Sequence, residues 1–355
     1  CLASIRATEN AFGLEVPEVA AQLRLLAKHG ETLQSHALHL FFLAAPDFLG
    51  VPSVIPLVES HPDAVALAAR LKGLGNRIAE VVAGRPVHPV SLQVGGVAKM
   101  PTRGALGELQ GRLEDSVDDL AAALALFQQF EIPDFHRETE FVSLAGGDDD
   151  YPWIGGDLLS TDGVRKAEDE YLAMTNEEVV DGNTSKWCHL SRDSFAVGAL
   201  ARFNNNHEGL VPEALQAAGT LGLAPVCHNP YHGNTAQLVE CVHVVHDSLR
   251  LIEEIRERRG EATMVPVQPR AGTGVSAVEV PRGILYHCYD YGDDGRVTAA
   301  DCVIPTTQNN GNIHRDLGAL VTHFATQDGM TDEALSRLCA MLVRAYDPCI
   351  SCSVH

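Results

Sequence analysis

The last nine residues hold the densest group of side chains that could bind a metal. Cys349 and Cys352 form a Cys-x-x-Cys pair, and His355 follows at the end of the sequence. Two thiolates at this spacing can hold one soft metal ion or bridge two. A structural zinc site would need a second Cys/His pair nearby, and a redox disulfide would precede a continuing helix. The residues alone leave three interpretations open: a metal site, a redox pair or buried thiols.

The composition indicates a large globular chain in a reducing compartment. Its 355 residues are 45% hydrophobic, which is enough for a large core. The formal net charge is -21 and no block of Lys or Arg interrupts it, which argues against nucleic acid and anionic membranes as partners. The nine cysteines are irregularly spaced, and no run of 18 apolar residues exists. We therefore expect a cytoplasmic protein that does not span a membrane.

Apolar residues at helical spacing, bounded by glycine and proline, predict a mostly helical chain. Within the second helix, His36 and His39 share a face, and Pro46-Asp47 is expected to break the helix. Thr102 is a predicted N-cap. The expected helices cover 1–13, 17–43, 62–82, 102–130, 162–174, 193–203, 213–221, 235–258, 312–326 and 331–346.

The clearest β signal is a hairpin near 283–304. Strands are expected over 283–291 and 296–304, because Gly292-Asp293-Asp294-Gly295 between them is a typical hairpin turn. Pro305 is expected to end the second strand, and 266–274 has the composition of a linker. Small strands are expected within 140–154. The fold class is therefore mainly α with small β elements, α+β.

Four segments resemble, in the same order, the large catalytic subunit of nickel-iron hydrogenases. They are Leu2-Ala3-Ser4-Ile5-Arg6-Ala7; Gly84-Arg85-Pro86-Val87-His88-Pro89 with Gly95-Gly96; Pro281-Arg282-Gly283 followed by Pro305-Thr306-Thr307-Gln308-Asn309; and Asp347-Pro348-Cys349-x-x-Cys352-x-x-His355. The resemblance spans the chain, so it implies one domain over 1–355 with the large helical fold of that subunit. It also implies reversible heterolytic cleavage of H2.

The resemblance assigns the terminal thiols to a Ni-Fe(CN)2(CO) centre. Cys349 would be a terminal nickel ligand, and Cys352 would bridge nickel and iron. Thiolates suit both metals, and one of them can accept the proton of a cleaved H2. This makes inert buried thiols the weaker interpretation.

Arg282, Pro305 and Thr306 would line the pocket of this centre. In the family an arginine hangs over the open metal position, where its planar fork of donors can orient H2 or a cyanide ligand. Thr306 could donate its hydroxyl to a cyanide. The alternatives are a surface arginine in a salt bridge, and a threonine that merely ends a strand.

His355 would bind a Mg2+ or Fe ion beyond the active site, by the same resemblance, and would mark a maturation cut after nickel insertion. The backbone carbonyl of Cys302 is a second candidate ligand for that ion. His39 and Asp47 keep a spacing that resembles the family's, whereas Ser35 stands where the family often has Asp. His88, His228, His232 and His243 are expected to cap loops rather than to carry protons.

Two further thiolates of the family's metal cage would precede Cys1, so the sequence is expected to hold half of the four-thiolate cage. Electrons would leave through iron-sulfur clusters in a small subunit, because this chain lacks cluster-type Cys spacing. From the small subunit the electrons would pass to further subunits of the complex, such as a heterodisulfide reductase, a flavin module or an NAD(P) module.

The details of the Pro305–Asn310 and Asn229–His232 segments most resemble the cytoplasmic multi-subunit branch of the family. Within it, the methyl-viologen-reducing, heterodisulfide-reductase-linked type is favoured. The alternatives are a non-catalytic structural homologue within a redox complex and a metal-binding protein without hydrogenase activity. The Cys349/Cys352 pair argues against the first.

Overall fold

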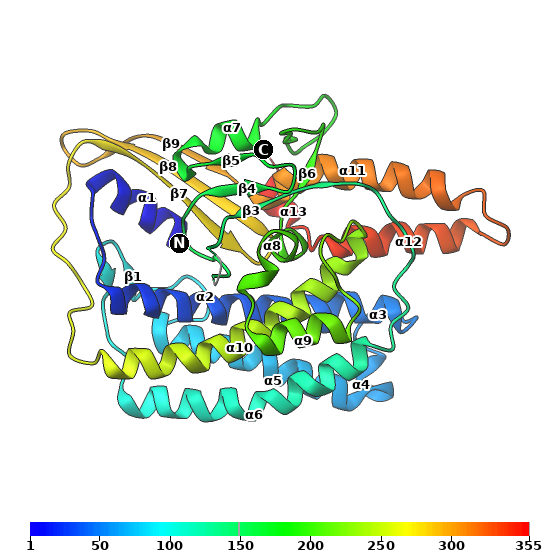
Figure 1. Ribbon diagram of the computed structural model, residues 1–355, viewed down its shortest axis with the longest axis horizontal. Helices are drawn as coiled ribbons and strands as arrows, with labels where there is room; N and C mark the ends of the chain where they lie inside the picture. The colour runs from blue at the N-terminus through cyan, green and yellow to red at the C-terminus, as the bar shows by residue number, and fades with distance from the viewer. Residues whose placement is uncertain (148–149, 355) are drawn as a thin grey trace.

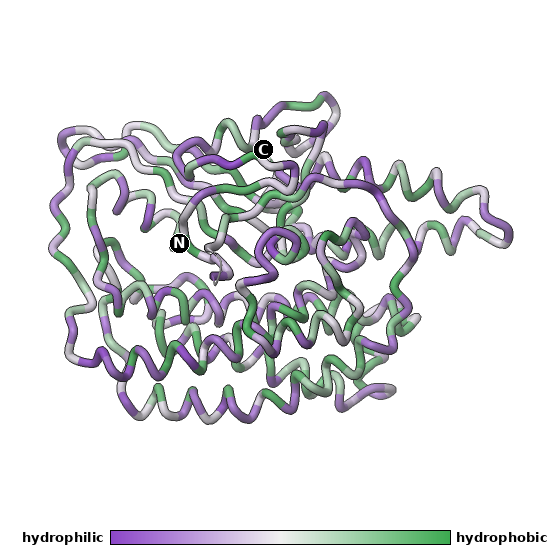
Figure 2. The backbone as a smooth tube through the Cα atoms, viewed as in Figure 1, coloured by the Kyte–Doolittle hydropathy of each residue, from purple (hydrophilic) through white to green (hydrophobic). Residues whose placement is uncertain are grey.

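A layer of long helices forms one side of the molecule. The computed structural model describes residues 1–147 and 150–354. In the lower half of Figure 1, α2 (Glu18–Leu38), α5 (Pro62–Ala83), α6 (Arg103–Phe127) and α10 (Gly233–Glu257) run side by side. Figure 2 shows hydrophobic and hydrophilic segments alternating along α6, as in a helix with one buried side. The buried sides form the main core, which includes Leu23, Leu33, Leu71, Leu106, Leu113, Val244 and Ile252.

The expected helix ends are confirmed at several places. The helix α1 (Leu2–Phe12) ends at Gly13, whose φ of 61° is left-handed. Thr102 caps α6 by accepting a hydrogen bond from the Ala105 N–H at 3.2 Å. The break expected at Pro46 is wrong. A π-helix (His39–Ala44) and α3 (Ala45–Phe48) continue α2, because Pro46 stands in the first turn of α3, where its missing N–H costs nothing.

A three-stranded antiparallel sheet packs against α1 and lies in the upper half of Figure 1. Its order is β7 (Gly272–Val280), β8 (Gly283–Tyr291) and β9 (Val297–Val303). The predicted β8–β9 hairpin is confirmed. The interpretation of 266–274 as linker is wrong from Gly272 on, because β7 begins there. A Cβ at Gly274 would lie 2.0 Å from the Ala7 carbonyl oxygen, so glycine lets α1 lie directly on the strand.

Shorter elements surround the sheet and the helices. A four-stranded sheet has the order β5-β4-β3-β6, and β1 pairs with β2. Strands partly replace the helices expected over 162–174 and 193–203, because short, polar, glycine-containing segments give little periodicity. The remaining elements are β1 (Leu92–Gln93), β2 (Gly96–Val97), β3 (Glu140–Leu144), β4 (Leu158–Ser160), β5 (Arg165–Lys166), β6 (Phe195–Ala196), α4 (Leu57–Ser60), α7 (Tyr171–Thr175), α8 (Ala199–Asn206) and α9 (Pro212–Thr220).

The C-terminal third ends in a helical hairpin. The helices α11 (Pro305–Phe324) and α12 (Asp332–Ala345) project together to the right in Figure 1, and α13 (Ile350–Ser353) follows. The helix expected from 312 begins seven residues earlier, with Pro305 as its first residue. Thr306 therefore lies in the first turn of α11 and does not end a strand. Among the described residues, no helix has the length and apolarity needed to cross a membrane.

Candidate active site

Arg282 and Asp347 form an ion pair beside the terminal cysteines. The Arg282 guanidinium donates from Nε to the Asp347 carbonyl oxygen at 2.5 Å and from Nη2 to its Oδ1 at 2.9 Å. The Asp347 side chain is 4% exposed and that of Arg282 is 31% exposed. The other carboxylate oxygen, Oδ2, has no hydrogen-bond partner in the described part of the chain. The ion pair therefore places charged groups, which form strong hydrogen bonds of defined direction, at the boundary between the protein core and the surface.

The β7–β8 turn sets the position of Arg282. Val280 pairs with Gly283 across this turn, so Pro281 and Arg282 lie at its tip. Gly283 has a φ of 135°, and a Cβ there would lie 2.3 Å from Val197 Cγ2. Only glycine fits this position without displacing the turn. The glycine of the Pro-Arg-Gly sequence is therefore required by the geometry of the turn, and the arginine supplies the charged group.

Asp347 lies in a strained turn between α12 and the cysteines. Its φ of 49° is left-handed, a conformation that aspartate tolerates better than most residues. Its N–H bonds to the Arg344 carbonyl oxygen at 2.8 Å. This turn ends α12 and directs the following residues toward the start of α11.

Cys349 lies at the N-terminal end of α11. Its backbone N–H donates to Thr306 Oγ1 at 3.1 Å. The first turn of this 20-residue helix carries the positive end of the helix dipole. The threonine hydroxyl hydrogen stays free to donate to another group. Thr306 and Pro305 are both buried, so the predicted residues of the third and fourth segments do meet.

The sulfur atoms of Cys349 and Cys352 are joined in a disulfide. Cys352 is exposed and Cys349 is partly exposed, so the interpretation of these thiols as inert and buried is wrong. The pair is accessible to a reductant, and a metal can bind it only after reduction. The structure is thus compatible with both the metal and the redox interpretation.

The predicted second ion is not tested by the structure. His355 lies outside the described residues. Cys302 is exposed on β9, and its Sγ lies 3.3 Å from Nδ1 of His287. Across 1–147 and 150–354, no three His, Cys, Asp or Glu side chains stand close enough together to hold a metal ion. The described side chains therefore supply two sulfur donors at the site.

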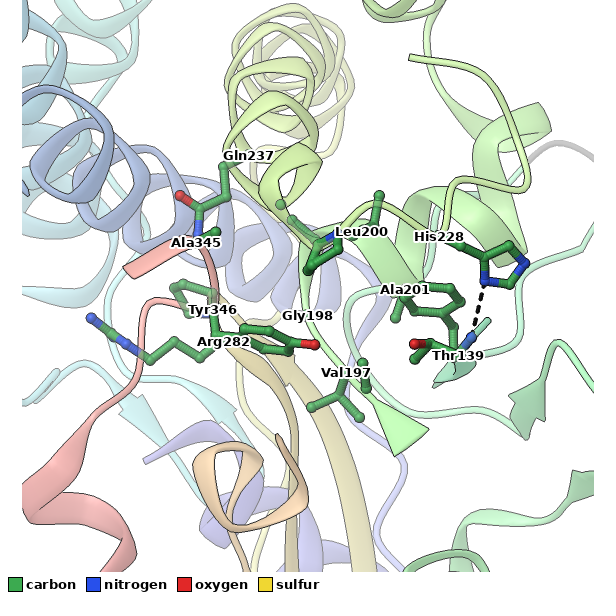
Figure 3. Close-up of a pocket in the computed structure, with 16 residues that line it drawn as sticks. Thr139, Val197, Gly198, Leu200, Ala201, His228, Gln237, Arg282, Ala345 and Tyr346 are labelled. Carbon is green, nitrogen blue, oxygen red and sulfur yellow. Dashed lines mark hydrogen bonds between the residues drawn. The ribbon is translucent and has the colours of Figure 1, made fainter. Parts of the chain in front are cut away.

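A small cavity lies behind Arg282. Its volume is about 30 Å3 and its walls include Val197, Leu200 and Ala201. Figure 3 shows Arg282 and Tyr346 on one side of it and His228 on the other, where Nδ1 accepts the Thr139 N–H at 3.1 Å. The walls between these ends are mostly apolar. The cavity is therefore suited to a small apolar molecule next to a charged group.

His39 ties the site to the helical layer. Its Nδ1 bonds Gln237 Oε1 on α10 at 2.6 Å, and its Nε2 donates to the Arg344 carbonyl oxygen at 2.8 Å. Asp47 pairs with the Arg344 side chain at 2.5 Å. His36 also bonds to α10, so the shared face predicted for the two histidines is confirmed. His39 and Asp47 thus hold the end of α12 that leads into the cysteines.

Three other histidines stabilise loops, as predicted. His228 accepts from Thr139, His243 Nδ1 accepts the Val211 N–H at 3.2 Å, and His232 bonds Thr235 at 3.1 Å. His88 has a φ of 55° in an exposed turn.

The start of the chain lies on the same side as Arg282. Glu31 on α2 pairs with Lys28 at 2.7 Å. Partial burial acts to raise the pKa of Glu31, but the charge and hydrogen bond of Lys28, together with the charge of Arg282, outweigh it and lower the pKa. Glu31 lines one pocket together with Cys1 and Lys28, and its carboxylate is within electrostatic reach of Arg282.

A buried ionic cluster below the site could not be predicted from sequence. Arg202 is fully buried between Glu240 and Glu279. These residues come from α8, α10 and β7, so no local spacing links them. The only signal was the position of Glu240 on the same helix face as His243 and Asp247.

Comparisons with known proteins agree with this geometry. The profile of the family described as nickel-dependent hydrogenase matches residues 1–72 and 165–355, which include Arg282 and the terminal cysteines. The alpha chain of sulfhydrogenase 1 from Pyrococcus furiosus is 29% identical over 360 residues, covering 100% of this chain and 82% of that protein. A vhu-type chain of the F420-non-reducing hydrogenase from Methanocaldococcus jannaschii is 30% identical, covering 87% of this chain and 79% of that protein.

A solved structure extends the similarity to the fold. An NAD+-reducing [NiFe]-hydrogenase in the H2-reduced state superposes with a TM-score of 0.87 at 27% identity, covering 100% of this chain and 84% of that one. A [NiFeSe]-hydrogenase from Dm. baculatum has a TM-score of 0.75 at 18% identity, a likeness of fold alone. The match of profile, relatives and fold shows that this chain belongs to the nickel-dependent hydrogenase family.

Proposed function

We propose that this chain is a catalytic hydrogenase subunit that cleaves H2 heterolytically and reversibly at a nickel-iron centre. The observation that carries the proposal is the Arg282–Asp347 pair beside Cys349 and Cys352. Family membership makes the chain an oxidoreductase that acts on H2. The residues proposed to act on H2 are Arg282, Cys349 and Cys352.

The donor set fits half of a nickel-iron centre. Two adjacent sulfurs, once reduced, are soft ligands that suit nickel and low-spin iron. The backbone N–H of Cys349 bonds to Thr306 in the first turn of α11, which carries the positive end of that helix's dipole. When bound, the centre would supply the redox chemistry of H2 cleavage. The CO and cyanide ligands of the iron are part of this proposal.

The side chains of this chain would orient the reactants and take up the proton. Arg282 is held by Asp347 at two atoms, so the orientation of its guanidinium is fixed and its remaining N–H groups would be available to orient a reactant. The Thr306 hydroxyl can donate to a cyanide nitrogen, since its oxygen already accepts the Cys349 N–H. A cysteine thiolate would accept the proton that leaves H2. The cavity behind Arg282 offers a small, mostly apolar space next to the arginine.

The remaining ligands belong to the proposal as well. His355 and the Cys302 carbonyl would bind a Mg2+ or Fe ion, which accepts oxygen and imidazole ligands. Two further thiolates would come from a Cys-x-x-Cys before Cys1. The residues upstream of Cys1 in the full gene test this directly.

The partner is a hydrogenase small subunit, since the relatives are themselves single chains of multi-subunit enzymes. We propose that electrons pass to iron-sulfur clusters held by that partner. Relatives named NAD-reducing and F420-non-reducing match at 28% and 30% identity, so they do not separate the electron acceptors. The heterodisulfide-reductase-linked type and the cytoplasmic location stay predictions.

Isotope exchange tests the function without requiring an acceptor. The assembled holoenzyme under D2 in H2O should release HD and H2 at a rate proportional to its nickel content. A metal-loaded complex that reduces artificial acceptors from other donors but shows no exchange would contradict the proposal. The same test separates a hydrogenase from a metal-binding relative without activity.

A further inference from the structure

Arg202 links the buried core to the turn that carries Arg282. Its guanidinium donates to the carbonyl oxygens of Val280 at 3.0 Å and Pro281 at 3.1 Å. These residues immediately precede Arg282 at the end of β7. A side chain on α8 thus fixes two consecutive peptide groups of the turn from below.

Two carboxylates lock the guanidinium in this position. Glu240 on α10 accepts from Arg202 Nε at 2.6 Å and from Nη2 at 2.8 Å, a bidentate pair. Glu279 on β7 accepts from Nη1 at 2.9 Å. The side chains of Arg202, Glu240 and Glu279 are 0%, 1% and 0% exposed, so water does not compete for these bonds.

The carboxylates are themselves held by other elements. Glu240 accepts from the Tyr151 hydroxyl at 2.6 Å and from His36 Nε2 on α2 at 2.7 Å. Glu279 Oε1 accepts the Leu144 N–H on β3 at 2.9 Å. The cluster therefore ties the Arg282 turn to three helices, α2, α8 and α10, and to a second sheet.

Glu240 stays ionised at pH values near neutrality. Burial acts to raise its pKa, but the charge and hydrogen bonds of Arg202, together with His36, lower the pKa to about 2. The ion pair is thus permanent near neutral pH. A permanent charge that donates to main-chain carbonyls is suited to holding a backbone and not to moving protons.

The residue that precedes α8 also contacts the Arg282 turn, on the C-terminal side of Arg282. Gly198 immediately precedes α8, and a Cβ there would lie 3.1 Å from the Arg282 carbonyl oxygen. Asn309 Nδ2 on α11 donates to that carbonyl at 3.5 Å. The backbone on both sides of the Arg282 side chain is therefore fixed.

We propose that Arg202, locked by Glu240 and Glu279, is a positioning residue that sets the place of Arg282 over the H2-activating site. The proposal rests on the function proposed above and adds a residue that touches neither metal nor substrate. Displacement of a catalytic group by about 1 Å can cost roughly 100-fold in rate. A β7–β8 turn that did not hold Arg282 in place would therefore lower the rate of H2 cleavage.

The test compares two chemically matched substitutions in the assembled holoenzyme. Arg202→Lys keeps the charge but not the fork that spans two carboxylates and two carbonyls. Arg24→Lys is the control, because Arg24 is also buried, pairs bidentately with Glu9 and donates to the carbonyls of Gln93 and Gly96. It supports the β1–β2 turn instead of the Arg282 turn.

We expect D2 exchange per nickel to fall roughly 10- to 100-fold in Arg202→Lys, with a raised KM for H2 and shifted CO and cyanide infrared bands. Arg24→Lys should lose stability but keep the exchange rate per nickel and the band positions. If Arg202→Lys does not assemble, Tyr151→Phe, which removes one bond to Glu240, should show a smaller fall in the same direction.

Unchanged exchange per nickel and unchanged bands in Arg202→Lys, or in Tyr151→Phe where that variant must replace it, would overturn the positioning role. The unsubstituted holoenzyme distinguishes this from failure of the function itself. If it shows exchange, the function stands and only the role of Arg202 falls. If it shows none, the proposed function fails.

Discussion

At the residue scale, Arg282 is bonded to two atoms of Asp347, its carbonyl oxygen and Oδ1, and these two bonds fix the orientation of the guanidinium. A lysine would keep the charge but lose the second bond and the planar fork. We expect Arg282→Lys to lower D2 exchange by roughly 100- to 1,000-fold, the cost of losing one well-placed donor. The infrared bands of the metal centre should persist, because Arg282 supplies no metal ligand in this account.

The matched control is Arg296→Lys, since Arg296 is 87% exposed at the β8–β9 turn. Its exchange rate should equal that of the unsubstituted enzyme. Exchange retained in Arg282→Lys at more than half of that rate would count against a catalytic role for Arg282.

The terminal cysteines allow a test that does not depend on activity. Cys349→Ser and Cys352→Ser should each lose nickel, measured by elemental analysis of the purified complex, because a hard hydroxyl oxygen replaces a soft sulfur. Cys339→Ser on α12 should keep nickel, since Cys339 lies among the apolar residues of the α11–α12 hairpin. Full nickel content in both terminal variants would favour the redox interpretation of the disulfide.

Sequence motifs predicted the residues at the site, but they did not predict the buried residues that hold them in place. Arg282, Thr306 and the cysteines were predicted from motif order, and the structure brings them together at one end of α11. The partners Arg202, Glu240 and Glu279 were not predicted, because each belongs to a different element. Hydrogen bonds between elements leave no periodic pattern in a sequence.

At the element scale, the interface of α2 and α10 should make stability depend on pH. Burial lowers the pKa of His29 to about 3 and of His243 to about 4, so both are neutral in the folded protein. Their unfolded pKa is about 6.5, so the unfolded chain binds more protons below that pH. Stability should therefore fall as pH drops from about 6.5 toward 4, by up to about 1.4 kcal/mol per pH unit for each histidine.

Denaturant unfolding between pH 4.5 and 7 measures this slope. His243→Gln should reduce it, because the titrating ring is removed while an acceptor for the Val211 N–H is kept. His246→Gln is the control on the same helix, because that ring is 22% exposed and faces Glu213. Equal slopes in the two variants would show that His243 is not the source.

Local sequence signals predicted some elements and failed for others. The β8–β9 hairpin followed from a strong turn between two apolar runs. In contrast, β7 begins with Gly272-Thr273-Gly274 after a proline-containing stretch, so it resembles a linker. Those glycines are needed because α1 lies against the strand, a tertiary cause that local propensity does not contain. Likewise, Pro305 was expected only to end a strand, and it also begins α11.

At the scale of the whole molecule, the fold brings Arg282, Thr306 and the terminal cysteines together from distant parts of the chain. The β7–β8 turn supplies Arg282, α11 supplies Thr306, and the segment after α12 supplies the cysteines. His36 on α2 and His39 in the π-helix that follows it bond to α10. Motif order predicted this assembly because the resemblance covered the chain, and the superposition on a [NiFe]-hydrogenase confirms the fold. The relatives named NAD-reducing and F420-non-reducing match this chain about equally well, so the similarity does not single out an electron acceptor.

Infrared spectroscopy of the purified, metal-loaded complex tests the central claim most directly. Carbon monoxide and cyanide bound to iron absorb between the amide and C–H regions, where the protein itself is nearly transparent. The account predicts one CO band and two cyanide bands that shift when H2 is added. A full-length, nickel-loaded sample without any such bands would contradict it.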